Sequence, residues 1–302
     1  MSPKEFCLDA DNEILEKQYE EDNFLVEAGG GQNGVCIIFF SGNGLYYPND
    51  KDVFEQKILH NNQYEWWAIG HSEEIVNRVE KIIYARDIYK QYYVKGINRR
   101  IDDIDKLCIL MSGLTKGYRV ITCGNSAGGY IAAIVGIYLN AERVFSFGGQ
   151  VTLQYLLRHK EEVGFEDSYY FVKLYEKDIL RSKYYNVIPL IQSSSVPIMY
   201  FYSALNEGDK EQVEYLKISG SVNNVRIFAM KSEDHGFLML NSCYKKILMM
   251  NEEQLTILCM KYNKKLISLR KWCLEILERK EAIKEIWRDV IRCHKSLQII
   301  FR

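Results

Sequence analysis

A serine framed by glycines is the feature that most constrains the fold of this chain. The motif Gly124-Asn125-Ser126-Ala127-Gly128 follows the β-branched run at 120–123 and opens the small-residue segment AGGYIAAIVGIYL at 127–139. The first segment is typical of a strand and the second of a buried helix. Glycines two residues on either side of a serine suit a sharp strand-to-helix turn, where side chains would collide with the backbone. The pattern predicts a serine hydroxyl exposed above the sheet, with an ordinary glycine-rich turn as the alternative.

Composition and charge favour a globular α/β protein. The chain has 302 residues, of which 47% are hydrophobic and 26% charged, which is enough for one large α/β domain and an appendage. Its 39 basic and 40 acidic residues give a formal net charge of −1. This balance provides no overall attraction to nucleic acid or to an anionic membrane, so we expect no nucleic-acid partner.

Several absences narrow the class of protein further. The eight cysteines include no C-x-x-C pair, and several lie in apolar runs, so we expect reduced thiols. The first residues are acidic and resemble no signal peptide, and no run reaches 18 apolar residues. These observations predict a cytoplasmic protein. The histidines are dispersed, and the glycine-rich segment 29–34 precedes a strand instead of following one, so we expect neither a metal nor a cofactor.

Alternating strand and helix patterns predict a mostly parallel sheet with helices on both faces. Phe24–Glu27 is predicted as an antiparallel edge strand, and the apolar run Val35–Phe40 as a strand covered on both faces. Further strands are predicted at 64–70, 143–149, 196–204 and 224–231, and further helices at 75–93 and 101–114. The last of these strands is the final one that the sequence pattern indicates.

Two segments do not follow this alternation. Residues 150–195 are rich in Tyr, Lys and Glu, and are predicted either as a lid-like insertion or as a surface helical insertion without a gating role. Residues 251–302 form a predicted helical extension to a catalytic domain at 1–250. Apolar residues recur there at helical spacing, namely Leu255, Leu258, Tyr262, Leu266, Leu269, Cys273 and Ile276. The locally basic extension is predicted to pack on the domain or a second subunit, or to contact a membrane surface or glycan.

With its G-x-S-x-G motif in this context, the chain resembles the α/β-hydrolase fold superfamily over residues 30–245. The resemblance implies the chain order of nucleophile, acid and base, which Ser126, Asp209 and His235 match. Each of the three follows a predicted strand, at the edge where ligands bind in open α/β sheets. Among the five histidines, His235 alone follows a late strand in a Gly-flanked loop. Glu207 is the second candidate for the acid.

The sequence gives weaker support to the remaining candidates for the acid and the base, and to the candidates for the oxyanion donors. Asp234 is the third candidate for the acid, because a residue adjacent to His235 would normally point away from it. His60, His71, His159 and His294 do not follow a late strand. By the resemblance, the amide of Ala127 is one oxyanion donor, and Asn43 in the loop Ser41-Gly42-Asn43-Gly44 is the other. That loop lacks the histidine of the HGGG-like lipase motif, so a simple tight turn is the alternative.

The resemblance implies acyl transfer through an acyl-serine, without a cofactor. Carboxylic-ester hydrolysis is the expected reaction, with a small acyl ester as substrate. The first alternative is an O-acetyltransferase of a bacterial surface polysaccharide or other glycan, with an acyl donor and a glycan acceptor. The 22 tyrosines are available for carbohydrate stacking, although aromatic residues also fill cores. The second alternative is a catalytically silent binding module with a hydrolase-like fold.

Overall fold

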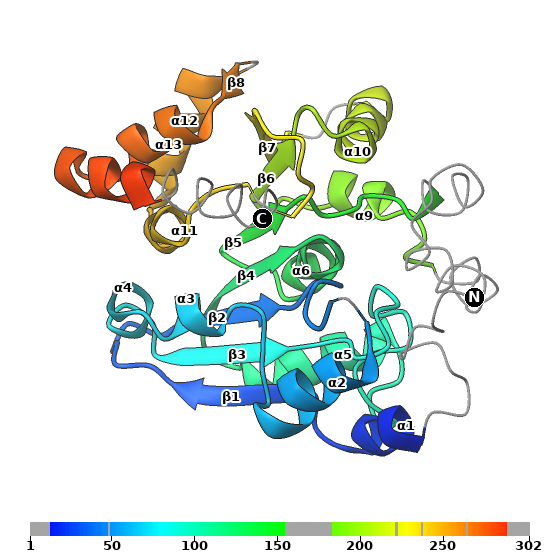
Figure 1. The fold of residues 1–302 in the computed structure, drawn as a ribbon. Coiled ribbons are helices and arrows are strands. Elements are labelled where there is room, and N and C mark those ends of the chain that lie inside the picture. Colours follow the sequence, from blue (N-terminus) through cyan, green and yellow to red (C-terminus); the bar gives the residue numbers. More distant parts are fainter. Residues whose placement is uncertain are drawn as a thin grey trace, which may run out of the picture.

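The computed structural model describes residues 13–47, 49–154, 183–220, 223–236, 238–263 and 265–288. Its centre is a single sheet in the order β1-β3-β2-β4-β5-β6-β7-β8 (Figure 1). The strands are β1 (Phe24–Ala28), β2 (Val35–Phe40), β3 (Lys81–Ala85), β4 (Arg119–Asn125), β5 (Arg143–Phe147), β6 (Ile198–Ser203), β7 (Val225–Met230) and β8 (Leu266–Ile267). β1 pairs with β3 in antiparallel fashion, and every other neighbouring pair is parallel.

Helices connect and cover these strands. In the first half of the chain they are α1 (Glu13–Glu20), α2 (Lys51–Phe54), a π-helical segment (Glu55–His60), α3 (Trp67–Gly70), α4 (Glu73–Val76), α5 (Ile104–Leu114) and α6 (Ala127–Tyr138). In the second half they are α9 (Ile188–Gln192), α10 (Glu207–Ile218), α11 (Asn241–Leu248), α12 (Glu252–Tyr262) and α13 (Leu269–Ile276). Residues 279–288 are also helical.

The sheet is buried on both faces, in keeping with the mostly apolar residues of its central strands. Side chains alternate along a strand. In β4, Val120 therefore belongs to the buried cluster that includes residues of α5, α6, α9 and α10, whereas Ile121 belongs to the cluster that includes residues of α3, α11, α12 and α13. These two groups of helices lie on opposite sides of the sheet in Figure 1. All six residues of β2 are buried. The predicted α/β class, with a mostly parallel sheet and helices on both faces, is confirmed.

Most predicted elements are present. The edge strand at 24–27, the strands at 35–40, 120–123, 143–149, 196–204 and 224–231, and the helices at 101–114 and 127–139 are confirmed within three residues at each end. The sequence distinguishes these strands from these helices because the two differ in residue type. β-branched and aromatic residues fill a strand such as β2, while small residues are frequent in α6.

Two predictions between β2 and β4 are wrong. Residues 64–70 form a turn and the short helix α3 instead of a strand, and the aromatic run buries Tyr64 and Trp66 against one face of the sheet. The predicted helix at 75–93 ends after Val76, and its next segment becomes β3. Ile82 and Ile83 of β3 pair with both β1 and β2. The pairing in the sheet therefore overrides a local pattern that was also compatible with a helix.

The C-terminal region adds a strand that the sequence pattern did not indicate. Lys231 N donates to Ile267 O at 2.8 Å, and β8 extends the sheet beyond β7. The apolar residues spaced for a helix are therefore divided between α12, β8 and α13, and Leu266 is half exposed in the strand. α12 and α13 bury Leu255, Leu258, Trp272 and other residues in the same cluster as the sheet.

The predicted insertion at 150–195 lies partly outside the described residues, since 155–182 are not among them. Its described end contains α9, where Ile188 and Ile191 pack with α6 and α10. Whether the insertion forms a lid therefore stays a prediction.

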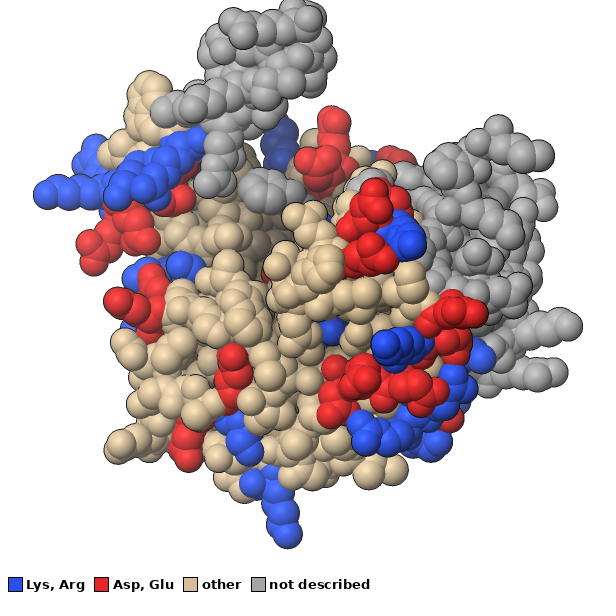
Figure 2. All heavy atoms as spheres, turned by 60° about the horizontal axis from the view of Figure 1, so that its bottom comes forward, with Lys and Arg blue, Asp and Glu red and all other residues tan. Residues whose placement is uncertain are grey.

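Charges of both signs mix on the surface. Figure 2 shows Lys and Arg beside Asp and Glu over much of one face, with wide uncharged areas between them. Arg99, for example, pairs with Glu16 and Glu20 of α1. Among the helices of the described ranges, none is both long enough and apolar enough to cross a membrane.

Candidate active site

The serine at the end of β4 occupies a strained turn. Ser126 has φ 53° and ψ −122°, a left-handed conformation that is uncommon for a residue with a side chain. A Cβ atom at Gly124 would lie 2.1 Å from Gly128 O, and one at Gly128 would lie 2.3 Å from Phe40 O. The two glycines are therefore needed for the close approach of β2, β4 and α6, as the motif predicts.

The turn also places Ser126 at the start of a helix. Its N–H donates to Phe147 O of β5 at 2.8 Å, and α6 begins at the next residue. The first amides of a helix have no partner within it, and they carry the positive end of its dipole. Ser126 is only partly buried, and it lies at the carboxyl edge of the sheet.

The three residues predicted from the hydrolase resemblance lie in contact. Ser126 Oγ is 2.8 Å from His235 Nε2, and His235 Nδ1 is 2.5 Å from Asp209 Oδ1. The Asp209 side chain is 2% exposed, whereas the His235 side chain is 35% exposed. The imidazole thus joins a buried carboxylate to the hydroxyl of a partly buried serine.

Asp209 is held by the end of β6 and the first turn of α10. Its Oδ2 accepts a hydrogen bond from Ser203 N at 2.9 Å, while Asn206 is the N-cap of α10 and accepts from Asp209 N at 3.1 Å. The prediction that 205–209 is a loop is therefore wrong from Glu207 onward. An Asn followed by acidic residues is a helix start signal, and here it fixes the carboxylate that faces His235.

The loop that carries His235 is fastened to the same region. Ser203 Oγ donates to Asp234 O, Asn206 Nδ2 donates to Glu233 O at 3.2 Å, and Leu205 N donates to Ser232 O at 3.0 Å. β6 and the start of α10 therefore position the acid and the histidine together.

The structure separates the alternative candidates from this cluster. Glu207 pairs with Lys210 and its side chain is 85% exposed, so it does not face His235. The Asp234 side chain is exposed, and its backbone oxygen makes the contact with Ser203. His71 contacts Glu27 of β1, at the edge of the sheet opposite to the one that carries Ser126. His60 is exposed on the π-helical segment. His159 and His294 lie outside the described residues.

Two backbone amides are available beside the serine. Ala127 N, the first amide of α6, and Asn43 N, in the turn after β2, make no hydrogen bond within the described part of the chain. The neighbouring Gly42 N–H instead donates to the side chain of Glu65. A Cβ atom on Gly42 would lie 2.5 Å from Asn125 O, so the loop of Asn43 touches the turn of Ser126.

Sequence reasoning did not single out Ser203 or Glu65, which support this arrangement. No local pattern marks Ser203, since its contacts are with residues 6 and 31 positions away. One feature of the sequence could have identified Glu65: it is a lone acidic residue between Tyr64 and Trp66 in an aromatic run. A charged residue among buried aromatic residues normally has a specific partner.

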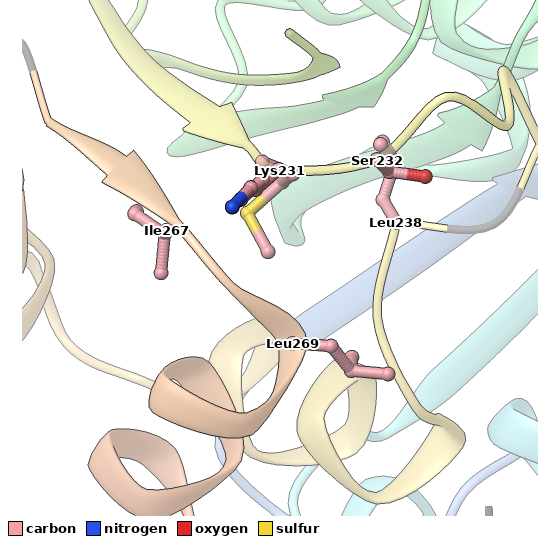
Figure 3. Close-up of a pocket in the computed structure, with 6 residues that line it drawn as sticks. Lys231, Ser232, Leu238, Ile267 and Leu269 are labelled. Carbon is pink, nitrogen blue, oxygen red and sulfur yellow. The ribbon is translucent and has the colours of Figure 1, made fainter. Parts of the chain in front are cut away.

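A small pocket of about 130 Å³ lies beside the segment that carries His235. Its lining residues come from β7, β8 and the adjoining segments: Met230, Lys231, Ser232, Leu238, Ile267 and Leu269 (Figure 3). Ser126, Asp209 and His235 do not line it. Within the ranges that the structure covers, no group of three His, Cys, Asp or Glu side chains could hold a metal ion.

Several solved structures are similar to this chain at low sequence identity. A 2,6-dihydroxy-pseudo-oxynicotine hydrolase is 16% identical over 70% of this chain and 58% of its own, with a TM-score of 0.49. A lipase-esterase related protein from Clostridium acetobutylicum is 14% identical over 72% and 94%, with a TM-score of 0.44. The capsule O-acetyltransferase of Neisseria meningitidis serogroup A is 15% identical over 70% and 83%, with a TM-score of 0.45. No family model and no curated protein matches the chain by sequence.

Similarity at these identities concerns the fold and transfers no reaction to this chain. The fold itself rests on the features described above: a mostly parallel sheet with helices on both faces, a serine on a strained turn between β4 and α6, and an acid and a histidine that follow β6 and β7 in that order. The chain has the α/β-hydrolase fold.

Proposed function

We propose that the protein is a serine-dependent esterase that hydrolyses carboxylic esters through an acyl-serine. The observation that carries this proposal is the continuous contact from the Ser126 hydroxyl through His235 to the buried Asp209. A serine hydroxyl is a weak nucleophile, and it needs a base within hydrogen-bond reach whose tautomer is fixed by a third group.

In the acylation step, Ser126 Oγ attacks the ester carbonyl while His235 Nε2 takes its proton. Asp209 stabilises the imidazolium that results and remains ionised. The carbonyl oxygen becomes an oxyanion, which the amides of Ala127 and Asn43 stabilise. His235 then gives the proton to the leaving alcohol as the C–O bond breaks, and the acyl group stays on Ser126.

In the deacylation step, His235 takes a proton from water, whose oxygen attacks the acyl-serine. Collapse of the second oxyanion returns the proton to Ser126 Oγ and releases the carboxylic acid. In comparable sites, each amide that donates a hydrogen bond to the oxyanion lowers the activation barrier by about 3 kcal/mol. The site needs no cofactor for either step.

The same acyl-serine would serve an O-acetyltransferase, in which a glycan hydroxyl replaces the water. The test supplies an activated acetyl ester with and without candidate glycans and measures acetate and acetylated glycan separately. The proposal predicts rapid acetate release that no glycan diverts. Slow release that a glycan redirects into its own acetylation would support the transferase, and an absence of both products would support a silent binding module.

A further inference from the structure

We propose that Glu65 is a positioning residue of this site, and the inference rests on the proposed function. Its carboxylate fixes the Gly42 amide so that the next amide, that of Asn43, is presented to the oxyanion. In this role Glu65 touches no substrate and acts through the backbone of the turn after β2.

The segment around Glu65 is bound to the end of β2 by successive contacts. Trp66 Nε1 donates to Phe40 O at 3.1 Å, Glu65 N donates to Ser41 Oγ at 3.3 Å, and Gly42 N donates to Glu65 Oε2. The Trp66 ring is 4% exposed and packs on Phe39 and Phe147. The last of these contacts reaches Gly42, the residue that immediately precedes Asn43.

The second oxygen of the carboxylate connects the other two loops of the site. Asn125 Nδ2 lies 3.4 Å from Glu65 Oε1 and 3.4 Å from Gly236 O. Asn125 directly precedes Ser126, and Gly236 directly follows His235. Glu65 therefore lies at the point where the turn of Asn43, the turn of Ser126 and the loop of His235 meet.

Burial raises the pKa of Glu65, while the hydrogen bonds from Gly42 and Asn125 lower it by less. A carboxylate charge beside the amides would oppose the negative charge that develops on an oxyanion. In the proposed role, the side chain of Glu65 must accept a hydrogen bond from the Gly42 N–H, and it does not need to carry a charge. A glutamine at this position retains the oxygen acceptor, whereas a methionine of similar length offers only the weakly accepting thioether sulfur.

The experiment compares Glu65→Gln with Glu65→Met, using ester hydrolysis and amide hydrogen exchange of the peptide that contains residues 41–44. Glu73→Ala, an exposed acid at the start of α4, is the matched control. We expect Glu65→Met to lower kcat about 10- to 100-fold with KM nearly unchanged, since a misplaced oxyanion donor acts on the transition state. Exchange at 41–44 should accelerate in this variant.

Glu65→Gln should restore kcat to within about fivefold of the parent protein and should keep the exchange at 41–44 slow. Equal kcat values for Glu65→Met and the parent protein would overturn the inference. A loss in Glu65→Gln as large as that in Glu65→Met would also overturn it. Failure of the proposed function would be distinct, because the parent protein itself would then release no acid from any ester.

Discussion

Ser126 Oγ lies 2.8 Å from Nε2 of His235, although 109 residues separate the two in sequence. Two independent constraints produce this contact. The glycine-framed turn after β4 projects the hydroxyl from the edge of the sheet, and the contacts of Ser203 and Asn206 hold the loop after β7 next to it. The reactivity of the serine should therefore depend on residues in both halves of the chain.

Removal of the histidine or its acid should abolish most activity while the fold remains. We expect His235→Ala and Asp209→Asn each to lower kcat by about 10⁴-fold, because the base or its correct tautomer is lost. Steady-state ester hydrolysis measures the effect, with circular dichroism to check folding. Glu207→Gln, whose carboxylate faces solvent, serves as the control. Full activity of Asp209→Asn together with an inactive Glu207→Gln would transfer the role of the acid to Glu207.

Two Gly→Ala changes should alter stability in opposite directions. In Gly128→Ala the new Cβ would meet Phe40 O, so we expect the free energy of unfolding to fall by about 1–3 kcal/mol. Gly113 lies within α5, and an added Cβ there would have no atom within 4 Å apart from the adjacent residues and the backbone of the helix itself. Gly113→Ala should therefore raise the free energy of unfolding by about 0.5–1 kcal/mol. Urea denaturation measures both. A stable, active Gly128→Ala protein would contradict the close packing of the turn.

The contribution of Asp87 to the free energy of unfolding should fall as the pH rises. Burial raises the pKa of its carboxyl to about 6, although the amides of Tyr89, Gln91 and Tyr93 donate to it. The folded state therefore holds a proton that the unfolded state has lost above pH ~4, and this group's contribution to stability falls between pH ~4 and ~6.

The comparison for Asp87 is with Asp87→Asn, which cannot titrate. The free energy of unfolding of the parent protein minus that of Asp87→Asn should be about 2.5 kcal/mol larger at pH 4 than at pH 7. Urea denaturation at several pH values measures this difference. A difference that does not change with pH would show that Asp87 has an ordinary pKa in the folded protein.

The sequence predicted the parts of the site that depend on local backbone geometry. Gly124 and Gly128 frame the turn because a Cβ atom at either position would collide with the backbone of Gly128 or Phe40. The positions of Asp209 and His235 followed from the strands that precede them and from the order implied by the resemblance. The parallel sheet followed from the alternation of apolar strands and helices.

The parts that sequence reasoning missed depend on contacts between distant segments. The apolar residues of β3 suit either a helix or a strand, and the pairing of β3 with β1 and β2 decides between them. β8 is only two residues long, so it has no pattern of its own. Glu65 acquires its partners Gly42 and Asn125 only in the folded chain. The predicted contacts of 251–302 with a membrane or a second subunit stay predictions.

The central claim is that Ser126 carries an acyl group during the reaction. Mass spectrometry of the intact protein after brief exposure to an activated acetyl ester, followed by peptide mapping, tests it most directly. The account predicts one added acetyl group on Ser126 in the parent protein and none in Ser126→Ala. Labelling by a fluorophosphonate should be lost in the same variant. Acetylation or fluorophosphonate labelling that survives Ser126→Ala unchanged would contradict the account.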